Sequence, residues 1–320
     1  MNKLSTLLVL ALIAFVAMAD DEFPTFSDYR AKQSLKFSNP AEEAFRGVVY
    51  NANLRSIKDH NANPKRTYNQ GVNRFTHYTK AEYVVLFLGN RDLGSLAPLS
   101  VSSPTVGAWA PTAVDWRNVT GVVSPIKDQG SCGGCFAFSA VAALESLRFQ
   151  AYGISADFSE QQIVSCQKAY GCSGGLIGNA LRYVQTYGIA TEANYPYTSG
   201  GGMSGTCKTI QSNWTLFTIS GVWDKTTMNT CADLAKNVTL RPVSVAVDGT
   251  NWSPYKNGTF NNCNNTKTNH AVLLVGVNSN EWIIKNSYGV GWGESGFIRL
   301  IATNGNNTCN VCKSISYPIK

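Results

Sequence analysis

The distribution of cysteines is the feature of this sequence that most restricts its fold. The chain has nine cysteines, and all of them follow residue 130. In a secreted protein, cysteines pair into disulfides, and an odd number leaves one thiol without a partner. The part of the chain after residue 130 is therefore expected to be a disulfide-bonded domain with one free cysteine.

The N-terminal residues indicate that the chain is secreted. Lys3 precedes an apolar stretch from Leu7 to Val16, and Ala17-Met18-Ala19 stands before the acidic Asp20. This order of basic, apolar and small residues is typical of a cleaved signal peptide, and the stretch is too short for a membrane anchor. We therefore expect the remainder of the chain to enter an oxidising compartment, where disulfides and N-glycans form.

Cys135 is the candidate nucleophile among the cysteines. It follows Gly133 and Gly134, and an apolar series with helical spacing runs from Phe136 to a stop at Gly153. A thiol at a helix N-terminus lies near unpaired N–H groups and the positive end of the helix dipole, which favour the thiolate. The commoner role of a secreted cysteine is half of a disulfide or a small buried apolar residue, so this interpretation needs support elsewhere in the chain.

His270 is the candidate base for this thiol. Histidine has the unperturbed pKa best suited to take and return a proton near neutral pH. His270 is the only histidine after Cys135, and it precedes an apolar stretch that predicts a β-strand. Asn286 follows another short strand-like run and could orient the imidazole without adding charge. A single histidine before a strand is more often structural, but no other base follows the candidate nucleophile.

These residues resemble those of the papain family of cysteine proteases, and within it the branch that contains cathepsin L. The family signature is Cys-Gly-Ser/Ala-Cys-Trp/Tyr with a histidine and an asparagine roughly 130–150 residues downstream, and papain is itself the reference example of a cysteine with a lowered pKa. The resemblance implies that Cys135 is the nucleophile, His270 the general acid/base and Asn286 the orienting residue. It also implies that Gln129 and the backbone N–H of Cys135 form the oxyanion hole.

Three positions depart from the commonest family pattern. Gly134 stands where serine or alanine is usual, and Phe136 replaces tryptophan or tyrosine. Tyr288 replaces the tryptophan that in the family covers the His–Asn hydrogen bond and walls the leaving-group side. Each replacement keeps the size or aromatic class, so we expect changes in specificity and rate rather than in chemistry.

The segment from Phe23 to about Gly94 is polar, helical in pattern and free of cysteine. Asn39-Pro40 predicts the start of a helix that runs to Asn61. By itself, the spacing along this run indicates an amphipathic helix. The same spacing matches the ERFNIN series of cathepsin L-like propeptides, with tyrosine in place of phenylalanine, at Glu42, Arg46, Tyr50, Asn53, Ile57 and Asn61.

A second family element follows this helix. Residues 71–77 match Gly-x-Asn-x-Phe-x-Asp, with His77 in place of the aspartate. In the family this region belongs to an inhibitory pro-domain, a small helical unit that lies through the catalytic cleft. Because a histidine gains charge on acidification, we hypothesise that His77 helps the pro-segment to loosen in an acidic compartment.

These features divide the chain into parts. Residues 95–110 are rich in serine, proline and alanine and carry no charge, which predicts an exposed linker that is open to cleavage. The stretch from Pro111 to Arg117 resembles the family's mature N-terminus, which we place near Ala110. The expected division is a signal peptide at 1–19, a propeptide at 20–109 with its inhibitory domain at about 23–94, and a mature protease domain at 110–320.

The mature part predicts an α+β fold with two lobes. Helical patterns come first: the helix after Cys135, a capping box at Ser159–Gln162, and a run from Leu176 to Tyr187 that ends at Gly188. Strand patterns follow at 243–247, 271–275, 282–284 and 297–301. This order fits the papain-like fold that the resemblance implies, with a helical left lobe and a β-barrel-like right lobe behind the helical pro-domain. Cys135 and His270 would then face each other across the cleft between the lobes.

The resemblance also implies a disulfide pattern. It pairs Cys132 with Cys172, Cys166 with Cys207 and Cys263 with Cys309, and it leaves Cys135 free. We further expect the two extra cysteines, Cys231 and Cys312, to bridge each other. Each bridge should contribute about 2–4 kcal/mol to stability.

Two Cys-x-x-Cys pairs, Cys132 with Cys135 and Cys309 with Cys312, allow a different interpretation: a Cys₄ zinc site or a redox dithiol. Zinc-binding pairs normally stand some tens of residues apart, and these two are much farther from each other. The expected compartment also favours oxidised cysteines. We therefore expect neither a metal nor another cofactor.

The substrate-binding residues follow from the resemblance alone. Gly174 and Gly175 look like the family's strip for the backbone of an extended substrate, where a side chain would block the peptide. The pocket for the substrate's second residue before the cut would lack an acid, so it should prefer Leu, Val or Phe to Arg. The resemblance assigns five residues to this pocket: Leu176, Ile177, Ala246, Thr268 and Ser314. The substrate-binding candidates are Gly133, Gly174, Gly175, Leu176, Ile177, Ala246, Thr268, Asn269, Tyr288 and Ser314.

The formal net charge of +7 is spread along the chain. Lysines and arginines alternate with acidic residues and form no run, so we expect no nucleic-acid partner and no membrane span. The expected partners of a monomeric protease are protein and peptide substrates, its own propeptide and cystatin-like inhibitors. Potential N-glycosylation sites, which favour a secretory, lysosome-like or extracellular location, stand at Asn118, Asn213, Asn237, Asn251, Asn257, Asn264 and Asn306.

We interpret the chain as a secreted or lysosomal cysteine endopeptidase that is made as a self-inhibited zymogen. The alternative from another class is a catalytically silent homologue that acts as a binding protein. Phe136 and Tyr288 leave room for that alternative, whereas the intact Cys135, His270 and Asn286 argue against it. An exopeptidase is a nearer alternative, but no obvious extra loop is present to block one end of the cleft.

Overall fold

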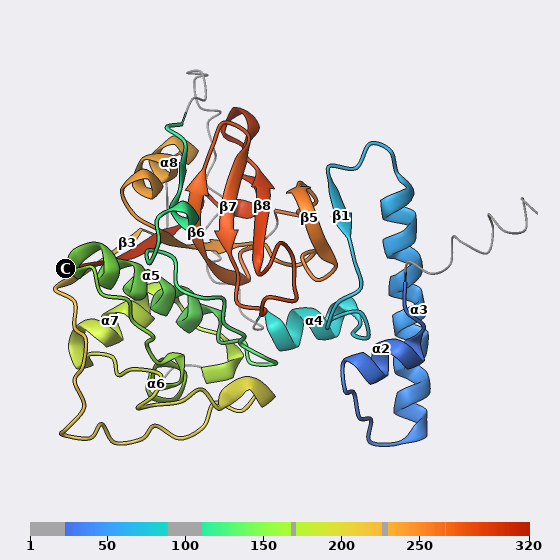
Figure 1. Ribbon diagram of the computed structural model, residues 1–320, viewed down its shortest axis with the longest axis horizontal. Helices are drawn as coiled ribbons and strands as arrows, with labels where there is room; N and C mark the ends of the chain where they lie inside the picture. The colour runs from blue at the N-terminus through green and yellow to red at the C-terminus, as the bar shows by residue number, and fades with distance from the viewer. Residues whose placement is uncertain (1–22, 89–110, 168–170, 226–229, 266) are drawn as a thin grey trace, which may run out of the picture.

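The computed structural model describes residues 23–88, 111–167, 171–225, 230–265 and 267–320 (Figure 1). The expected signal peptide, linker and mature N-terminus at Ala110 lie outside these residues. Figure 1 shows a small helical unit built from N-terminal residues beside a larger body of helices and a sheet. Within the described ranges, no helix has both the length and the apolar character needed to cross a membrane.

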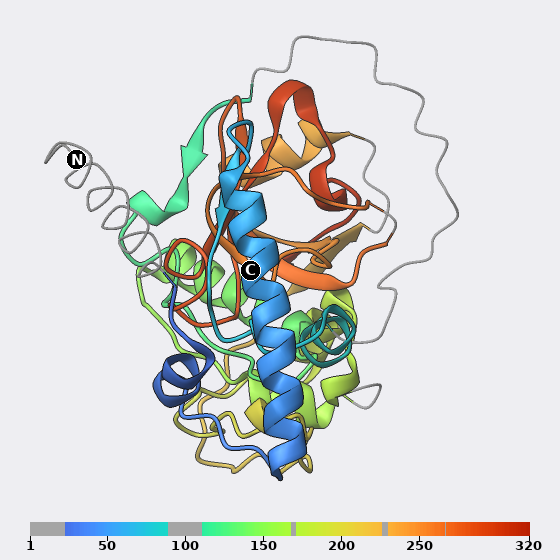
Figure 2. The ribbon, with the colours of Figure 1, turned by 90° about the vertical axis from the view of Figure 1, so that its right-hand side faces the viewer.

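The N-terminal unit contains α2 (Phe26–Lys32), α3 (Pro40–Ala62), β1 (Tyr68–Gln70) and α4 (Lys80–Phe87). Helix α3 begins at the predicted place, because the Asn39 side chain accepts the N–H of Glu42 at 2.9 Å and Pro40 needs no partner at that position. Thr79 and Glu82 cap α4 through reciprocal hydrogen bonds. Figure 2, which faces this unit, shows α3 as one long helix in front of the larger body.

Two asparagines of the polar series along α3 bind the segment that follows the helix. Asn53 donates to the carbonyls of Thr76 and Tyr78 at 2.8 and 2.9 Å. Asn61 donates to the Gln70 carbonyl and accepts the Gln70 N–H, both at 2.9 Å. Two residues of the ERFNIN pattern, Asn53 and Asn61, therefore hold the turn before α4 and strand β1 against α3.

One lobe of the larger body is helical and contains α5 (Cys135–Tyr152), α6 (Glu160–Cys166) and α7 (Ile177–Tyr187). Helix α5 ends at Gly153, whose φ of 68° is the left-handed conformation that side chains disfavour. Only half of the expected capping box forms at α6. Ser159 accepts the N–H of Gln162. The Gln162 side chain does not return to the N–H of Ser159, because it donates to the Gly188 carbonyl and so ties α6 to the end of α7.

The second lobe is a sheet with helix α8 (Cys231–Leu240) packed against β6. Its strands are β2 (Val114–Asp115), β3 (Gly221–Lys225), β4 (Val243–Val247), β5 (Tyr255–Phe260), β6 (His270–Val277), β7 (Glu281–Lys285), β8 (Phe297–Ile301) and β9 (Ile315–Ile319). Short 3₁₀ turns lie at Trp116–Asn118, Gly171–Ser173, Ser199–Gly201, Thr303–Gly305 and Thr308–Asn310.

The strands follow the order β1-β5-β8-β7-β6-β4-β9-β3, and β2 pairs with β6. Strand β1 belongs to the N-terminal unit and pairs with β5, with Tyr68 opposite Gly258. The N-terminal unit therefore extends the sheet of the larger body, as Figure 1 shows at the right of the sheet. The expected barrel-like lobe is an open sheet in the described residues, because its end strands β1 and β3 each pair on one side only.

Helix α5 lies between the two lobes. Its residues Ala142 and Ala143 pack against the sheet at Leu273, in a cluster that is separate from the core of the helical lobe. Small alanine side chains let the helix approach β6 closely. Because Cys135 begins α5 and His270 begins β6, this contact places the two candidate catalytic residues on facing elements.

The structure contains the disulfides expected from the sequence: Cys132–Cys172, Cys166–Cys207, Cys231–Cys312 and Cys263–Cys309. The remaining cysteine, Cys135, is free and buried. The two Cys-x-x-Cys pairs of the sequence are thus divided among different bridges. Three of their four cysteines are held in disulfides, which leaves no Cys₄ zinc site and no dithiol.

Candidate active site

Cys135 lies at the start of α5 and is 1% exposed. Its sulfur is 3.9 Å from the backbone carbonyl of Leu88, a residue of the N-terminal unit. Burial raises the pKa of the thiol to about 11, and hydrogen bonds from nearby backbone N–H groups, including that of Ala271, only partly oppose the shift. The helix N-terminus was expected to favour the thiolate. In this form of the chain that effect is outweighed, because water is excluded from the sulfur.

His270 and Asn286 form the pair expected from the sequence. Nε2 of His270 lies 2.7 Å from Oδ1 of Asn286, and the same oxygen accepts the N–H of Ser287 at 2.9 Å. An amide oxygen only accepts, so Nε2 carries the proton of the neutral ring. Nδ1 is then the bare nitrogen, and it has no hydrogen-bond partner within the described residues. The ring is therefore oriented to take a proton at Nδ1.

Aromatic side chains enclose the imidazole. Tyr288 stacks on His270 with ring centroids 5.1 Å apart, and Trp252 meets the ring edge-on at 5.8 Å. This burial lowers the pKa of His270 to about 4, although the hydrogen bond with Asn286 raises it. Near neutral pH the imidazole is thus neutral and the Cys135 thiol is protonated. The reactive ion pair is disfavoured in this form.

Gln129 is fully buried, and its side-chain amide is held at both ends. Oε1 accepts the hydroxyl of Ser287 at 2.6 Å, which turns Nε2 to the opposite side. Nε2 donates to the carbonyls of Phe87 at 2.8 Å and Cys132 at 2.9 Å. A side-chain N–H aimed at a carbonyl oxygen next to the thiol has the geometry of an oxyanion-hole donor.

Residues of the N-terminal unit fill the space around these side chains. Helix α4 lies at the end of the sheet, next to the helical lobe (Figure 1). The Phe87 carbonyl at its end binds Gln129, and the carbonyl of the next residue, Leu88, faces the Cys135 thiol. Leu88 is 1% exposed, and its side chain lies beside Gly249. No substrate can reach the thiol while this segment is in place.

Further contacts fasten the N-terminal unit to the larger body. Arg74 forms an ion pair with Asp128, the residue before Gln129. Asn73 donates to the Ser253 carbonyl at 2.7 Å. With the β1–β5 pairing, these contacts run from the edge of the sheet to the candidate catalytic residues.

The candidate substrate strip lies on the helical lobe. A side chain at Gly175 would stand about 2.7 Å from the Phe136 ring, so Phe136 fills the space beneath this backbone. Gly174 has a φ of 105°, which also favours glycine. Leu176 is exposed and Ile177 is buried at the start of α7. Gly133 is held through its N–H, which donates to the Cys172 carbonyl at 2.8 Å.

Ala246 and Ser314 meet at one end of β4. Strand β4 pairs with β9 in the register Val245 opposite Ile315, so Ser314 is next to Ala246 across the strands. Ala246 is buried and Ser314 is partly buried. The structure thus brings these two pocket candidates together although they are far apart in the sequence.

Thr268 and Asn269 lead directly into β6 and are both buried. Oδ1 of Asn269 accepts the N–H of Gly249 at 2.9 Å, and its Nδ2 donates to the Thr250 hydroxyl at 2.8 Å. Asn269 therefore fixes the loop after β4 beside His270, a structural role that the sequence did not indicate.

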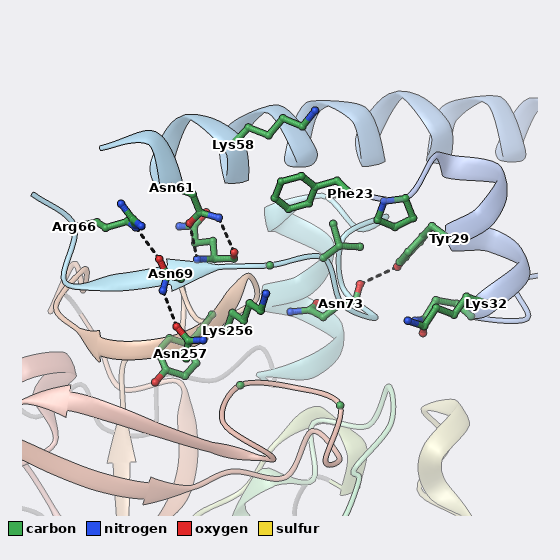
Figure 3. A pocket seen from close by; sticks show the side chains of 18 of the residues that line it. Phe23, Tyr29, Lys32, Lys58, Asn61, Arg66, Asn69, Asn73, Lys256 and Asn257 are labelled. Atoms are coloured by element: carbon green, nitrogen blue, oxygen red, sulfur yellow. Dashed lines mark hydrogen bonds between the residues drawn. The ribbon is translucent and has the colours of Figure 1, made fainter. Parts of the chain in front are cut away.

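A hollow of about 830 Å³ lies away from the candidate catalytic residues, between α2, α3 and β5 (Figure 3). Asn69 bridges its wall, accepting from Arg66 at 2.6 Å and donating to Asn257 at 2.7 Å. Cationic side chains from distant parts of the sequence also line it: Lys32, Lys58, Arg66 and Lys256. Cys135 and His270 do not contribute, because the N-terminal segment fills the cleft where they lie.

Sequence reasoning missed several groups at this site. Ser287 orients both Asn286 and Gln129, and its position next to Asn286 was the available signal. Phe87 and Leu88 offered no such signal, because they are ordinary apolar residues and Leu88 stands 47 positions from Cys135.

Comparison with known proteins places these features in a family. Residues 110–319 match the papain family of cysteine proteases, and residues 26–83 match the cathepsin propeptide inhibitor domain. Cathepsin L of Sarcophaga peregrina is 35% identical over 345 residues, which cover 97% of this chain and 98% of the relative. Germination-specific cysteine protease 1 of Arabidopsis thaliana is 37% identical over 292 residues, which cover 85% and 76%.

Solved structures give the same result. Digestive procathepsin L 3 from the larval midgut of Tenebrio molitor has a TM-score of 0.78 and 33% identity, covering 92% of this chain and 98% of its own. The recombinant stem bromelain precursor has a TM-score of 0.77 and 30% identity, with coverages of 92% and 97%. The silent-homologue alternative gains no support from these matches. The chain belongs to the papain family of cysteine proteases, with cathepsin L among its homologues, and is a cysteine endopeptidase zymogen that carries its propeptide inhibitor domain.

Proposed function

We propose that Cys135, His270, Asn286 and Gln129 perform peptide hydrolysis in the mature enzyme. The observation that carries this proposal is the 2.7 Å contact of His270 Nε2 with Asn286, which leaves Nδ1 as the basic nitrogen. Nδ1 accepts the proton of the Cys135 thiol, and the resulting thiolate and imidazolium stabilise each other.

The thiolate attacks the carbonyl carbon of the scissile peptide bond. Negative charge develops on the carbonyl oxygen, which accepts hydrogen bonds from Gln129 Nε2 and the Cys135 N–H. The proton on Nδ1 of His270 passes to the leaving amine, and a thioester remains. A water molecule then gives its proton to Nδ1 and attacks the thioester, which releases the acid product and the thiolate.

The N-terminal unit keeps these atoms from reacting in the zymogen. The Phe87 carbonyl accepts the side-chain N–H of Gln129 that would otherwise face the substrate, and the Leu88 carbonyl lies next to the Cys135 sulfur. The same contacts exclude water, which raises the pKa of Cys135 and lowers the pKa of His270. Latency thus has a steric part and an electrostatic part, and both end when the segment leaves.

Labelling by a thiol-specific epoxide tests this assignment. The acid-matured protein should carry the label on Cys135 alone, as mass spectrometry can show, and Cys135→Ala should carry none. Hydrolysis of a peptide substrate should disappear in step with labelling. Cys135 that stays unlabelled in protein lacking its propeptide would contradict the proposed nucleophile.

Maturation removes the signal peptide at 1–19 and the propeptide at 20–109, and leaves an enzyme that begins near Ala110. The family match from residue 110 and the propeptide match at 26–83 support this division. N-terminal sequencing of the acid-treated protein checks it, and a start more than a few residues from Ala110 would refute it.

The pocket for the second residue before the cut is apolar and accepts Leu, Val or Phe. The adjacency of Ala246 and Ser314 at the end of β4 supports this assignment. Ser314→Glu should introduce an acid there and bring hydrolysis of peptides with Arg at that position. If an active Ser314→Glu enzyme hydrolyses Arg and Leu peptides in the same ratio of kcat/KM as the parent, the pocket assignment is refuted.

The enzyme acts as a monomer in an acidic lysosome-like compartment or outside the cell, where cystatin-like inhibitors can bind its open cleft. The four disulfides support an oxidising route of synthesis. Light scattering of the matured protein tests the monomer, and titration with a cystatin tests the inhibitor class.

A further inference from the structure

The hydroxyl of Tyr83, on helix α4, bridges two polar atoms at the catalytic site. It lies 3.3 Å from the carbonyl oxygen of Gly249, to which it donates, and 3.1 Å from the hydroxyl of Tyr288. A hydroxyl has one proton, so Tyr83 must accept from Tyr288. Tyr288 donates to Tyr83, and Tyr83 donates to Gly249. The site thus offers one donor and one acceptor, placed to receive a single hydroxyl group.

Both partners of Tyr83 are rigidly positioned. Tyr288 stacks on His270 at 5.1 Å and crosses Trp292 at 5.3 Å. Gly249 is fixed through its N–H by Asn269, the residue before His270. Tyr288 also meets Phe75 of the N-terminal unit at 5.0 Å. The contacts with His270, Trp292 and Asn269 belong to the larger body, so we expect them to hold the donor and the acceptor when α4 leaves.

Departure of α4 would leave the Tyr288 hydroxyl without its partner. It would also free one of the two lone pairs of the Gly249 carbonyl, because the other still accepts the N–H of Trp252 at 3.0 Å. Tyr83, Tyr288 and Leu88 are each at most 2% exposed in the zymogen, so the N-terminal unit covers the site closely. A tyrosine here differs from the tryptophan expected from the family pattern, because a phenol hydroxyl can donate and accept. This hydroxyl is therefore a property of this chain.

We propose that the Tyr288 hydroxyl and the Gly249 carbonyl form a subsite that selects a hydroxyl-bearing side chain on the leaving-group side of the substrate. Tyrosine is the side chain that matches the occupant Tyr83. The proposal rests on the proposed function, because it assigns a substrate preference to the same cleft. Water competes for both atoms in the open cleft, so we expect a modest preference, about 3- to 10-fold for Tyr over Phe.

Quenched peptides that differ only by Tyr or Phe test the proposal. The pair is placed first or second after the cut, and kcat/KM is measured with the matured enzyme. The parent should favour Tyr at one of these positions, whereas Tyr288→Phe and Tyr288→Trp should bring the ratio to about one. Using the ratio within each enzyme removes any general change in rate that results from altering the ring on His270.

A ratio near one in the parent at both positions would overturn the proposal, and so would a Tyr preference that survives in Tyr288→Phe. Either result leaves the proposed catalytic residues intact, because the peptides are still cut. Complete absence of cutting in the parent would instead contradict the proposed function.

Tyr83, which occupies the subsite in the zymogen, allows a second test that measures the rate of maturation. Tyr83→Phe should mature about 3- to 10-fold faster than the parent at a fixed acid pH, because the bridging hydroxyl is lost. Tyr187→Phe, which removes an exposed phenol hydroxyl on α7, is the matched control and should mature at the parent rate. Equal rates for Tyr83→Phe and the control would overturn the hydroxyl bridge on which the subsite rests.

Discussion

Two buried histidines in this zymogen have similarly lowered pKa values but lie in different surroundings. Burial lowers the pKa of His77, in the N-terminal unit, and of His270, in the catalytic site, to about 4 in each case. His270 is enclosed partly by residues that leave on maturation. His77 is enclosed by its own unit, where Nδ1 lies 2.7 Å from the Tyr29 hydroxyl and the ring lies 4.1 Å from that of Tyr78.

The lowered pKa therefore has different consequences for the two histidines. When the propeptide leaves, His270 regains water and its pKa can rise toward the range needed for catalysis. His77 has no such release while its unit stays folded. The unfolded unit would bind a proton below about pH 6.5, whereas the folded unit binds it only below about pH 4. The direction of this shift supports the hypothesis that acid favours opening of the N-terminal unit through His77.

The groups around His77 explain the direction of its shift. Burial is the largest cause, and the positive charges of Arg46 and Arg74 add to it, whereas the carboxylate of Glu82 opposes it. The Arg46 guanidinium is itself paired with Glu82 at 2.8 Å, so little negative charge remains for a protonated His77. The titratable and charged groups that face this ring are Tyr29, Arg46, Arg74, Tyr78 and Glu82.

The largest expected effect is the loss of peptide-hydrolysis activity when His270 is replaced. His270→Ala should lower kcat/KM of the matured enzyme about 10³- to 10⁴-fold, because the thiol loses its base and the leaving amine its acid. His60→Ala, at a partly buried histidine of α3, lies in the propeptide that maturation removes, so it controls only for effects of a histidine substitution on folding and processing of the zymogen. Peptide hydrolysis assays decide this, and a loss below tenfold for His270→Ala would contradict its role.

Gln129→Ala tests the catalytic site itself, because Gln129 is both an expected oxyanion donor and a contact of the propeptide. The matured enzyme should lose about 10²- to 10³-fold in kcat, because one oxyanion donor is removed. The same change deletes the hydrogen bond to Phe87, so the variant should also bind its propeptide less tightly. A variant that loses activity but binds its propeptide as tightly as the parent would show that the Phe87 contact is unimportant.

His77→Gln should sharpen the comparison on the side of the N-terminal unit. The shift from about 6.5 to about 4 corresponds to roughly 3 kcal/mol of opening free energy gained between those pH values. Glutamine does not titrate there, so the pH midpoint of maturation should fall. Zymogen processing measured from pH 3.5 to 7 checks this, with His60→Gln as the control.

His77→Asp, which introduces the residue of the family pattern, gives an independent check. It replaces the titrating imidazole with a carboxylate near Arg46 and Arg74 and should change the pH profile as well. If both variants mature with the pH dependence of the parent, the proposed role of His77 is wrong.

The smallest expected effect concerns the ion pair of Arg74 with Asp128. Both side chains are partly exposed, at 30% and 46%, so solvent screens the pair and its worth is about 0.2–1 kcal/mol. Arg74→Ala should speed maturation by at most about fivefold at low salt, and the difference should vanish in about 1 M salt. Arg55→Ala, at an exposed arginine of α3, controls for loss of charge alone.

Local signals in the sequence predicted several elements well. Asn39-Pro40 marked the start of α3, Gly153 marked the end of α5, and the apolar stretch after His270 marked β6. These features depend on neighbouring residues, which is why they can be read directly. The His270–Asn286 contact also lay within reach, because both residues stand beside predicted strands.

The state of the catalytic residues could not be predicted in the same way. The pKa of Cys135 follows from desolvation by residues such as Leu88, and no local pattern indicates which distant segment will cover a side chain. The pairing of β1 with β5 joins residues about 190 positions apart, so the extension of the sheet by the propeptide was missed for the same reason. Strand β1 is also very short and carries little pattern of its own.

The central claim is that the propeptide silences the thiol electrostatically as well as sterically. The most direct test is the pH dependence of Cys135 alkylation by a small thiol reagent, followed by mass spectrometry in the full-length zymogen and in the matured enzyme. The zymogen should react with a midpoint near pH 11, and the matured enzyme with a midpoint below 7. Equal midpoints, with only the rates differing, would show that the propeptide acts as a steric block alone and would contradict this account.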